Sequence, residues 1–434
     1  MSWVKRSERV FQIFFILPIL AVCILTLQLR GLEPEGGGPA AAEAGEKTPF
    51  TIEQADDFIQ RTDSLTGSGI YILQGNVRIR RGESHIRCGT LTYFPGSRHF
   101  LCIESVLLTD SERRVSSDTL MYYVDAGRYR ALGSLRWESM GLAGTGLAGD
   151  YYRSTDLLVI EGEAVARDSL RRLEADKIEY DYATGRVRAE GSVVLTDTRS
   201  GSMATAASGL YDRGTDISIL TGRPKVVFYL ESDSLKLRPY NLTCDRLLNF
   251  GADSMVATGR VVLADDSLRA TSDSLFHDRA SGRSYFRSGG PRIDHPAYSM
   301  RGGKIDILTS GRRLELVVAT GSARGEFFQA GRGVDTSGTG MDNWIEGDTL
   351  NVAFGPAGLD SIVAAGEARS YLRQSLEESV NYVIGSRILL LWQGGLIDRM
   401  EVAGGGRGLY LMLDTTGQIS ADPDSAAAGK HNGK

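Results

Sequence analysis

The chain has 434 residues, and its 49 Lys and Arg against 54 Asp and Glu give a formal net charge of −5. This balance, without a basic patch interleaved with aromatic residues, argues against nucleic acid as a partner. The 52 Gly and only 11 Pro indicate a turn-rich β protein rather than a disordered one.

An apolar run at residues 10–29 follows three basic residues, Lys5, Arg6 and Arg9. The run is long enough to cross a bilayer as a helix, and the basic residues predict that residues 1–9 stay in the cytoplasm. We therefore expect a transmembrane anchor that places the rest of the chain outside the cytoplasm. Cleavage as a signal peptide and lipidation at Cys23 are the alternatives. Residues 30–60, where Gly, Ala, Glu and Pro abound, are expected to form a flexible linker.

Residues 61–413 carry a repeat whose lead residue is nearly always Gly. The first lead residues stand 29 residues apart, and the later gaps are 31, 37, 30, 32, 45 and 39 residues. A period of this size is the signature of stacked supersecondary units, here called rungs. We expect about eleven rungs, led by Gly75, Glu104, Gly133, Gly162, Gly191, Gly222, Gly259, Gly289, Gly321, Gly366 and Gly405. The longer gaps indicate insertions, such as a Gly-rich loop at 331–340.

Each rung contains two segments of alternating polarity. Apolar residues recur two and four positions after the lead residue, as at Val77 and Ile79. A second segment often starts with Asp and is apolar two and four positions later, as in Asp118, Leu120 and Tyr122. Alternation with period two predicts strands with one buried face, and Gly-containing turns separate them. The predicted fold class is therefore all-β, with two strands of roughly ten residues in each rung.

The recurring Asp residues allow two interpretations. We interpret them as turn caps, because Asp side chains accept hydrogen bonds from nearby backbone N–H groups. A ladder of metal ligands is the alternative, but no partner acid recurs beside them. The residues concerned are Asp118, Asp176, Asp245, Asp273 and Asp348.

Motifs for catalysis or for cofactors are not evident. The stretch Gly144–Gly149 matches the phosphate-binding pattern G-x-G-x-x-G, but it lies inside the β repeat and no helical period follows. The five His residues show no metal-ligand spacing. We therefore expect no catalytic, cofactor or metal site, and not an enzyme. A carbohydrate-active β-solenoid enzyme would need clustered acids on one face, and no such cluster is convincing.

Cys88 and Cys102 flank the turn Pro95-Gly96 at equal distance. This spacing is compatible with a cross-strand disulfide in an oxidising compartment. Two buried free thiols are the alternative, because cross-strand geometry often fails to meet the requirements of a disulfide.

Several phrases of the repeat resemble a known family. They are Leu173–Tyr180 with Thr184–Leu195, Gln74–Ile79, and Ser272–Leu275 with Gly282–Tyr285. They resemble the OstA-like (organic-solvent-tolerance) domain of the lipopolysaccharide-transport proteins LptA, LptC and the N-terminal part of LptD. The similarity covers roughly residues 65–412 and blurs after Gly321. It implies an elongated β-jellyroll, or folded-over β-taco, of two sheets with an apolar interior.

The resemblance also implies a function. It points to a non-enzymatic lipid-binding bridge component that carries lipopolysaccharide, or a related acylated lipid, across the periplasm to the outer membrane of a Gram-negative-type bacterium. Expected partners are the inner membrane, other β-jellyroll transport proteins joined end to end by strand pairing, and a separate ATPase transporter complex. The inward positions would line the lipid path: Val77, Ile79, Leu91, Tyr93, Val106, Leu108, Leu120, Tyr122, Leu135, Trp137, Ile178, Tyr180, Val193, Leu195, Leu247, Val261, Leu263 and Leu275.

The main alternative is a structural β-stack scaffold in outer-membrane biogenesis whose inward residues form a dry core. The predicted layout is a cytoplasmic N-terminus at 1–9, an inner-membrane anchor at 10–29, a linker at 30–60, the OstA-like β domain at 61–413 and a disordered tail at 414–434.

Overall fold

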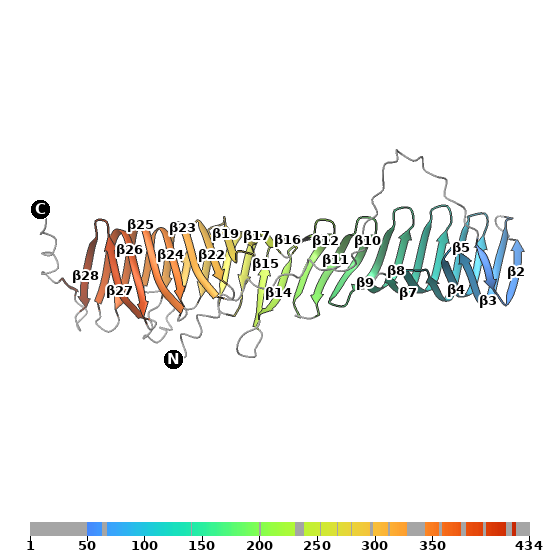
Figure 1. The fold of residues 1–434 in the computed structure, drawn as a ribbon, viewed down its shortest axis with the longest axis horizontal. Coiled ribbons are helices and arrows are strands. Elements are labelled where there is room, and N and C mark those ends of the chain that lie inside the picture. The colour runs from blue at the N-terminus through green and yellow to red at the C-terminus, as the bar shows by residue number, and fades with distance from the viewer. Residues whose placement is uncertain are drawn as a thin grey trace, which may run out of the picture. The chain divides into compact units, whose positions relative to one another are not determined.

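The computed structural model is all-β, and every strand pairing among the described residues is antiparallel (Figure 1). The structure describes residues 50–62, 67–139, 141–198, 201–230, 238–251, 253–266, 268–278, 280–295, 298–310, 313–327, 343–355, 358–374, 379–393, 396–413 and 419–421. No helix among these residues is long and apolar enough to span a membrane. The predicted anchor at 10–29 and the predicted loop at 331–340 lie outside them.

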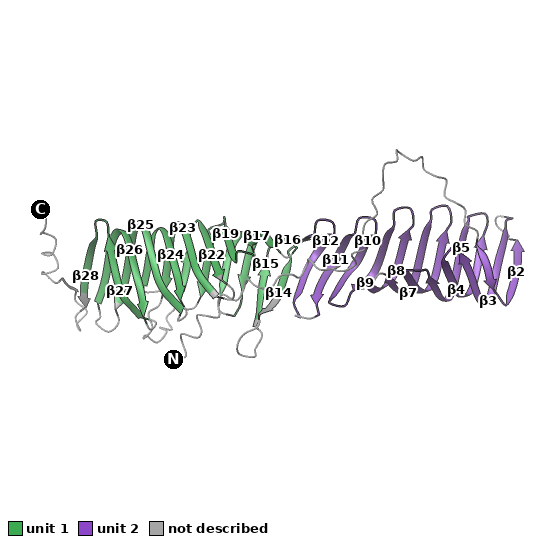
Figure 2. Cartoon of the chain, in the orientation of Figure 1, with its two compact units in different colours: residues 1–18, 223–434 green, residues 19–222 purple. Residues whose placement is uncertain are grey.

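The chain divides into two compact units (Figure 2). The unit of residues 19–222, purple in Figure 2, is called the N-terminal unit here. Its strands are β1 (Thr51–Gln54), β2 (Asp57–Thr62), β3 (Gly69–Arg81), β4 (Ser84–Phe94), β5 (His99–Thr109), β6 (Arg113–Tyr123), β7 (Arg128–Ser139), β8 (Leu142–Tyr152), β9 (Leu157–Arg167), β10 (Arg171–Asp181), β11 (Arg186–Asp197), β12 (Met203–Asp212) and β13 (Ile217–Thr221).

The other unit, green in Figure 2, comprises residues 1–18 and 223–434 and is called the C-terminal unit. Its strands are β14 (Lys225–Leu230), β15 (Arg238–Thr243), β16 (Arg246–Phe250), β17 (Ser254–Ala264), β18 (Arg269–Asp278), β19 (Arg283–Arg287), β20 (Arg292–His295), β21 (Tyr298–Arg301), β22 (Lys304–Ser310), β23 (Arg313–Phe327), β24 (Asn343–Gly355), β25 (Gly358–Gln374), β26 (Ser379–Gln393), β27 (Leu396–Ala403), β28 (Arg407–Leu413) and β29 (Ile419–Ala421).

A β-bulge interrupts every second long strand of the N-terminal unit near its middle, and the lead residue of the repeat lies in it; these strands are β3, β5, β7, β9 and β11. Gly191 has a φ of 74° and Ser192 a φ of 48°, and the register with β10 shifts around them. Two successive residues in the left-handed region bend a strand, and Gly adopts this conformation without strain. All eleven predicted lead residues have positive φ. We call the row of bulges the spine.

The recurring Asp residues lie at the spine, four of them in the middle of strands and Asp245 directly before β16. Asp176 is inside β10, and a Cβ added to Gly191 would lie 2.1 Å from its Oδ2. In one rung the roles are exchanged, because Glu104 holds the lead position and packs over Gly89. The same contact joins Asp118 to Gly133, Asp245 to Gly259, Asp273 to Gly289 and Asp348 to Gly366.

For the four Asp residues inside strands, the predictions that they cap turns and that strands begin at them are therefore wrong, whereas β16 does begin directly after Asp245. The alternation of polarity is broken at the bulge, and in the sequence this break looks the same as the end of a strand. Other Asp residues cap the turns. Asp110 Oδ1 accepts hydrogen bonds from the N–H groups of Glu112 and Arg113, and Asp168 Oδ1 from those of Leu170 and Arg171.

The spine divides the strands of the N-terminal unit into halves that form two facing layers. Arg81 and Tyr122 lie on opposite sides of the spine, yet the Arg81 guanidinium donates a hydrogen bond to the Tyr122 hydroxyl. This contact is consistent with a folded-over β-jellyroll. Layer A contains 77–81, 84–88, 106–109, 113–117, 135–139, 142–146, 164–167, 171–175 and 193–197, and layer B contains 69–74, 90–94, 99–103, 119–123, 128–132, 148–152, 157–161, 177–181 and 186–190.

The core lies along the inner faces of the layers. Val77, Val193 and Leu263 are 1%, 2% and 3% exposed, and all the predicted inward residues are buried or partly buried. The C-terminal unit keeps the same alternation, and Ile305, Leu350 and Ile388 are fully buried there. Period-two burial therefore extends beyond Gly321, where the sequence similarity blurs.

Three boundary expectations need correction. Residues 51–62 form β1 and β2, although most of them fall in the predicted linker. Both strands pair with β3, so the β structure begins at Thr51 and not at residue 61. Residues 419–421 form β29 against β28, inside the predicted disordered tail. Backbone pairing to an existing strand orders these short segments, which carry little apolar periodicity of their own. The assignment of 61–413 to one family domain stays a prediction.

Candidate functional site

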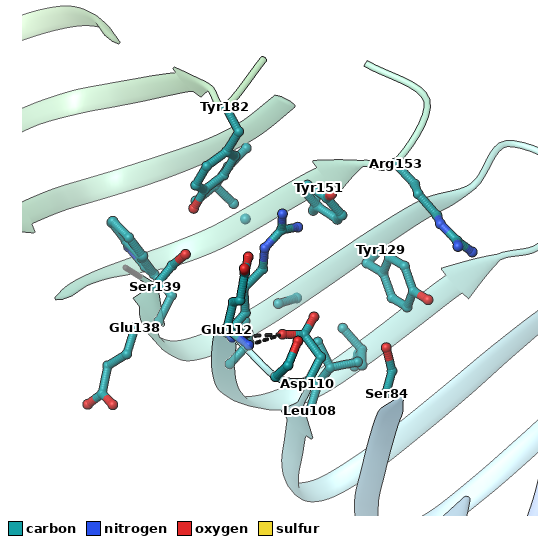
Figure 3. Close-up of a pocket in the computed structure, with 18 of the residues that line it drawn as sticks. Ser84, Leu108, Asp110, Glu112, Tyr129, Glu138, Ser139, Tyr151, Arg153 and Tyr182 are labelled. Atoms are coloured by element: carbon teal, nitrogen blue, oxygen red, sulfur yellow. Dashed lines mark hydrogen bonds between the residues drawn. The ribbon is translucent and has the colours of Figure 1, made fainter. Parts of the chain in front are cut away.

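A cavity of about 390 Å³ lies between the two layers of the N-terminal unit. Its inner wall is apolar and comes from both layers: Leu108, Val115, Leu135 and Trp137 from layer A, and Leu120, Ala131 and Leu158 from layer B. Figure 3 shows Tyr182, Tyr151 and Tyr129 in a row that faces Ser139, Glu112, Asp110 and Ser84. The cavity therefore combines an apolar floor with a polar rim.

Glycines in β8 leave the space for the floor. A Cβ on Gly144 would lie 2.4 Å from Trp137 Nε1, and one on Gly149 would lie 2.6 Å from Leu135 Cδ2. The stretch Gly144–Gly149 is thus a strand whose missing side chains let large neighbours fit, and it does not open a helix. Trp137 Nε1 is buried without a hydrogen-bond partner among the described residues. A buried donor of this kind is rare and favours a polar ligand atom beside it.

Aromatic rings form a cross-strand ladder along the inner side of layer B. Directly opposed pairs join Tyr71 to Tyr93, Tyr93 to Phe100 and Phe100 to Tyr122. The ladder continues through Tyr129 to Tyr151, with ring centroids 4.3 Å and 6.4 Å apart at these two steps. Burial raises the pKa of the Tyr129 and Tyr151 hydroxyls, so both stay neutral at physiological pH.

Two arginine side chains reach this ladder from layer A. The Arg81 guanidinium lies 5.0 Å from the Phe50 ring centroid and 4.9 Å from that of Tyr122. The Arg113 guanidinium lies 4.8 Å from the Tyr151 ring centroid and 4.9 Å from that of Tyr182. Cations over ring faces gain electrostatic stabilisation, which is larger when water is excluded.

An ion pair also holds Arg113. Its Nη2 lies 3.3 Å from Asp156 Oδ1, which accepts a hydrogen bond of 2.6 Å from the Tyr151 hydroxyl. Burial by itself lowers the pKa of Arg113, but the hydrogen bond with Tyr151 and the nearby Asp156 outweigh it and raise the pKa. Arg113 is therefore a permanent cation at the rim.

The structure brings four of the predicted inward residues into this cavity. They are Leu108, Leu120, Leu135 and Trp137. The other predicted residues share the inner faces but do not line it, and the role of the whole set in lining a lipid path stays a prediction. The sequence reasoning missed Arg81, Arg113, Tyr129, Tyr151 and Tyr182. A signal existed for Tyr129, because Tyr71, Phe100 and Tyr129 all stand four residues before a lead residue.

Cys88 and Cys102 are both buried free thiols in the structure. A hydrogen bond from Cys102 lowers the pKa of Cys88, while the hydrogen bond to Cys88 and burial raise the pKa of Cys102. The two sulfurs are thus neighbours, and a disulfide between them stays a prediction. Cys244 is also free and buried, and burial raises its pKa to about 12.

The comparison with protein families gives one match. Residues 60–186 match the family described as LptA/(LptD N-terminal domain) LPS transport protein. No curated protein is similar enough to the chain to count as a match. The matched segment contains the cavity and most of the aromatic ladder. It supports involvement in lipopolysaccharide transport, and the resemblance noted in the sequence is confirmed there. Residues 60–186 are therefore similar to the LptA/LptD N-terminal domain family of LPS transport proteins.

Proposed function

We propose that this chain is a non-enzymatic lipid-binding component that carries lipopolysaccharide, or a related acylated lipid, across the periplasm to the outer membrane. The observation that carries the proposal is the cavity between two apolar layers, inside the segment that matches the transport family. A volume of about 390 Å³ is in the usual range of small-ligand pockets, so it suits part of an acyl chain rather than a whole glycolipid.

The remaining parts of the proposal follow the family and the N-terminal sequence. An anchor at residues 10–29 would hold the chain at the inner membrane, with the β structure in the periplasm. Energy would come from a separate ATPase transporter complex. Other β-jellyroll proteins would extend the path by strand pairing at the chain's edge strands.

Photo-crosslinking tests the proposal on two adjacent residues of β7. Leu135 points into the cavity and is 3% exposed, whereas the next residue, Arg136, is exposed on the outer face. A photoreactive amino acid at 135 should capture lipopolysaccharide, with the purified full chain and in cells, at several times the yield seen at 136. Equal capture at both positions, or capture only at 136, would contradict an interior lipid path.

A dry-core scaffold is the second candidate function. Complete burial of Ile305, Ile345 and Leu350 in the C-terminal unit favours it, because close-packed interiors leave no space for a ligand. If crosslinkers at Ile345, Leu350 and Leu135 all capture no lipid, this result favours the scaffold. Capture at all three positions would support a lipid path in both units.

A further inference from the structure

Three guanidinium groups line the cavity, and two of them, those of Arg81 and Arg113, belong to partly buried side chains from distant parts of the sequence, whereas Arg153 is exposed. Arg81 ends β3 and Arg113 begins β6, and both line the cavity. Arg81 lies on the same strand face as the buried Val77 and Ile79, so it follows the inward side of layer A. Both cations therefore lie beside an apolar floor, where charge is poorly screened by water.

Arg81 lacks a counter-ion. Its contacts among the described residues are with the Phe50 and Tyr122 rings and with the hydroxyls of Tyr122 and Tyr129, and no carboxylate pairs with it there. Its Nε is buried without a hydrogen-bond partner in this part of the chain. A cation that has lost water without gaining an acid is unfavourable by itself, so an external anion would stabilise it.

Arg113 has spare donors, because its ion pair with Asp156 uses Nη2 and a guanidinium has five N–H groups. The acidic residues at the rim do not neutralise the two arginines. Asp110 Oδ1 accepts hydrogen bonds of 2.9 and 2.7 Å from the backbone of its own turn. Glu83, Glu112 and Glu138 are exposed.

We infer that Arg81 and Arg113 form a binding site for the phosphate group of an acylated amphiphile whose hydrocarbon chain lies on the Leu120, Leu135 and Trp137 floor. This inference rests on the proposed function and adds the part of the lipid that is recognised. Phosphate is the favoured anion, because guanidinium groups donate paired N–H bonds to its oxygens.

Binding measurements on the purified full chain test the site. The probes are lipid A with its phosphates and the same lipid A after dephosphorylation, in identical detergent micelles, with inorganic phosphate as competitor. Wild type should bind the phosphorylated lipid about 10- to 100-fold more tightly, which is the value of hydrogen bonds to charged groups. Arg81→Gln with Arg113→Gln should remove this preference, so that the two lipids bind with equal affinity. The matched control is Arg114→Gln, on the exposed face of β6, and this variant should keep the preference for the phosphorylated lipid.

The outcomes separate the two proposals. If wild type binds neither lipid, the proposed function fails and this inference fails with it. If wild type binds both lipids equally, the phosphate site is wrong while lipid binding stands, and this comparison needs no variant to fold. If Arg81→Gln weakens the binding of both lipids equally, Arg81 contributes packing only and does not recognise phosphate. Competition by inorganic phosphate as strong as that by the lipid would reduce the site to one for free phosphate and overturn the lipid assignment.

Discussion

At the scale of single residues, an acidic side chain in the spine packs over a glycine of the neighbouring strand. Asp176 occupies the space that a Cβ on Gly191 would need, and Glu104 occupies the equivalent space over Gly89. In these rungs either strand can supply the small residue and the other the acid, but an acid is not required, since Leu147 packs over Gly162 and Ala207 over Gly222. The repeat is therefore kept by a steric requirement at a bulge, in addition to the backbone requirement for positive φ.

Gly191→Ala should lower the free energy of unfolding by about 2–4 kcal/mol, because a left-handed residue gains a side chain and Asp176 must move. Gly201→Ala is the matched control. Gly201 has a φ of 70° with nothing within 4 Å of its added Cβ, so only the backbone term of about 1–2 kcal/mol applies. Urea unfolding monitored by circular dichroism measures both.

A second variant separates the steric part of the stability loss in Gly191→Ala from the backbone part. Asp176→Gly in the Gly191→Ala background should recover the steric part of the loss. The steric account is wrong if Gly191→Ala is no more destabilising than Gly201→Ala, or if the double variant is less stable than Gly191→Ala alone.

At the scale of elements, β8 decides where the cavity lies. Three positions of β8 have no room for a side chain. Added Cβ atoms there would lie within 2.4–2.6 Å of Trp137 and Leu135 of β7 and of Ile160 of β9. A phosphate-loop pattern in the sequence is thus explained by packing between strands. Large side chains on β7 therefore fill the space over the small residues of β8.

Gly149→Val should reduce lipid capture from position 135 several-fold, because the new methyl groups occupy the space beside Leu135. We expect a stability loss of about 1–3 kcal/mol, typical of overpacking. Ala148→Val is the control, since it adds bulk to the adjacent residue, which does not line the cavity. Capture is measured by lipopolysaccharide immunoblot of the crosslinked full chain. Undiminished capture in Gly149→Val would place the lipid elsewhere.

At the scale of the whole molecule, the edge strands decide what the chain can join. Among the described residues β1 and β2 pair only with β3, and they expose Ile52 at 53% and Phe58 at 58%. An open edge with exposed apolar side chains is a template for strand addition. This is the surface on which we expect another β-jellyroll protein, or a second copy, to pair.

Phe58→Lys should weaken association through this edge by about tenfold, because an edge lysine opposes strand addition. Phe276→Lys is the matched control, since Phe276 is 38% exposed but its strand β18 has partners on both sides. Sedimentation of the full chain over a concentration series, alone and with a β-jellyroll partner, measures association. Equal effects of the two substitutions would exclude a specific role for the β2 edge.

The sequence by itself determined the period, the two strands of each rung and the inward positions such as Val77 and Val193. These depend on local alternation and on backbone conformations that favour Gly, both of which a linear pattern records. It mistook the spine Asp residues for turn caps, because a bulge in the middle of a strand has the same local signs as a strand end. Only the tertiary structure decided that Arg81 meets Tyr122, 41 residues away, and that Gly149 leaves space beside Leu135. These contacts arise when the two layers face each other across the spine, and no periodicity along the chain encodes which side chains then meet.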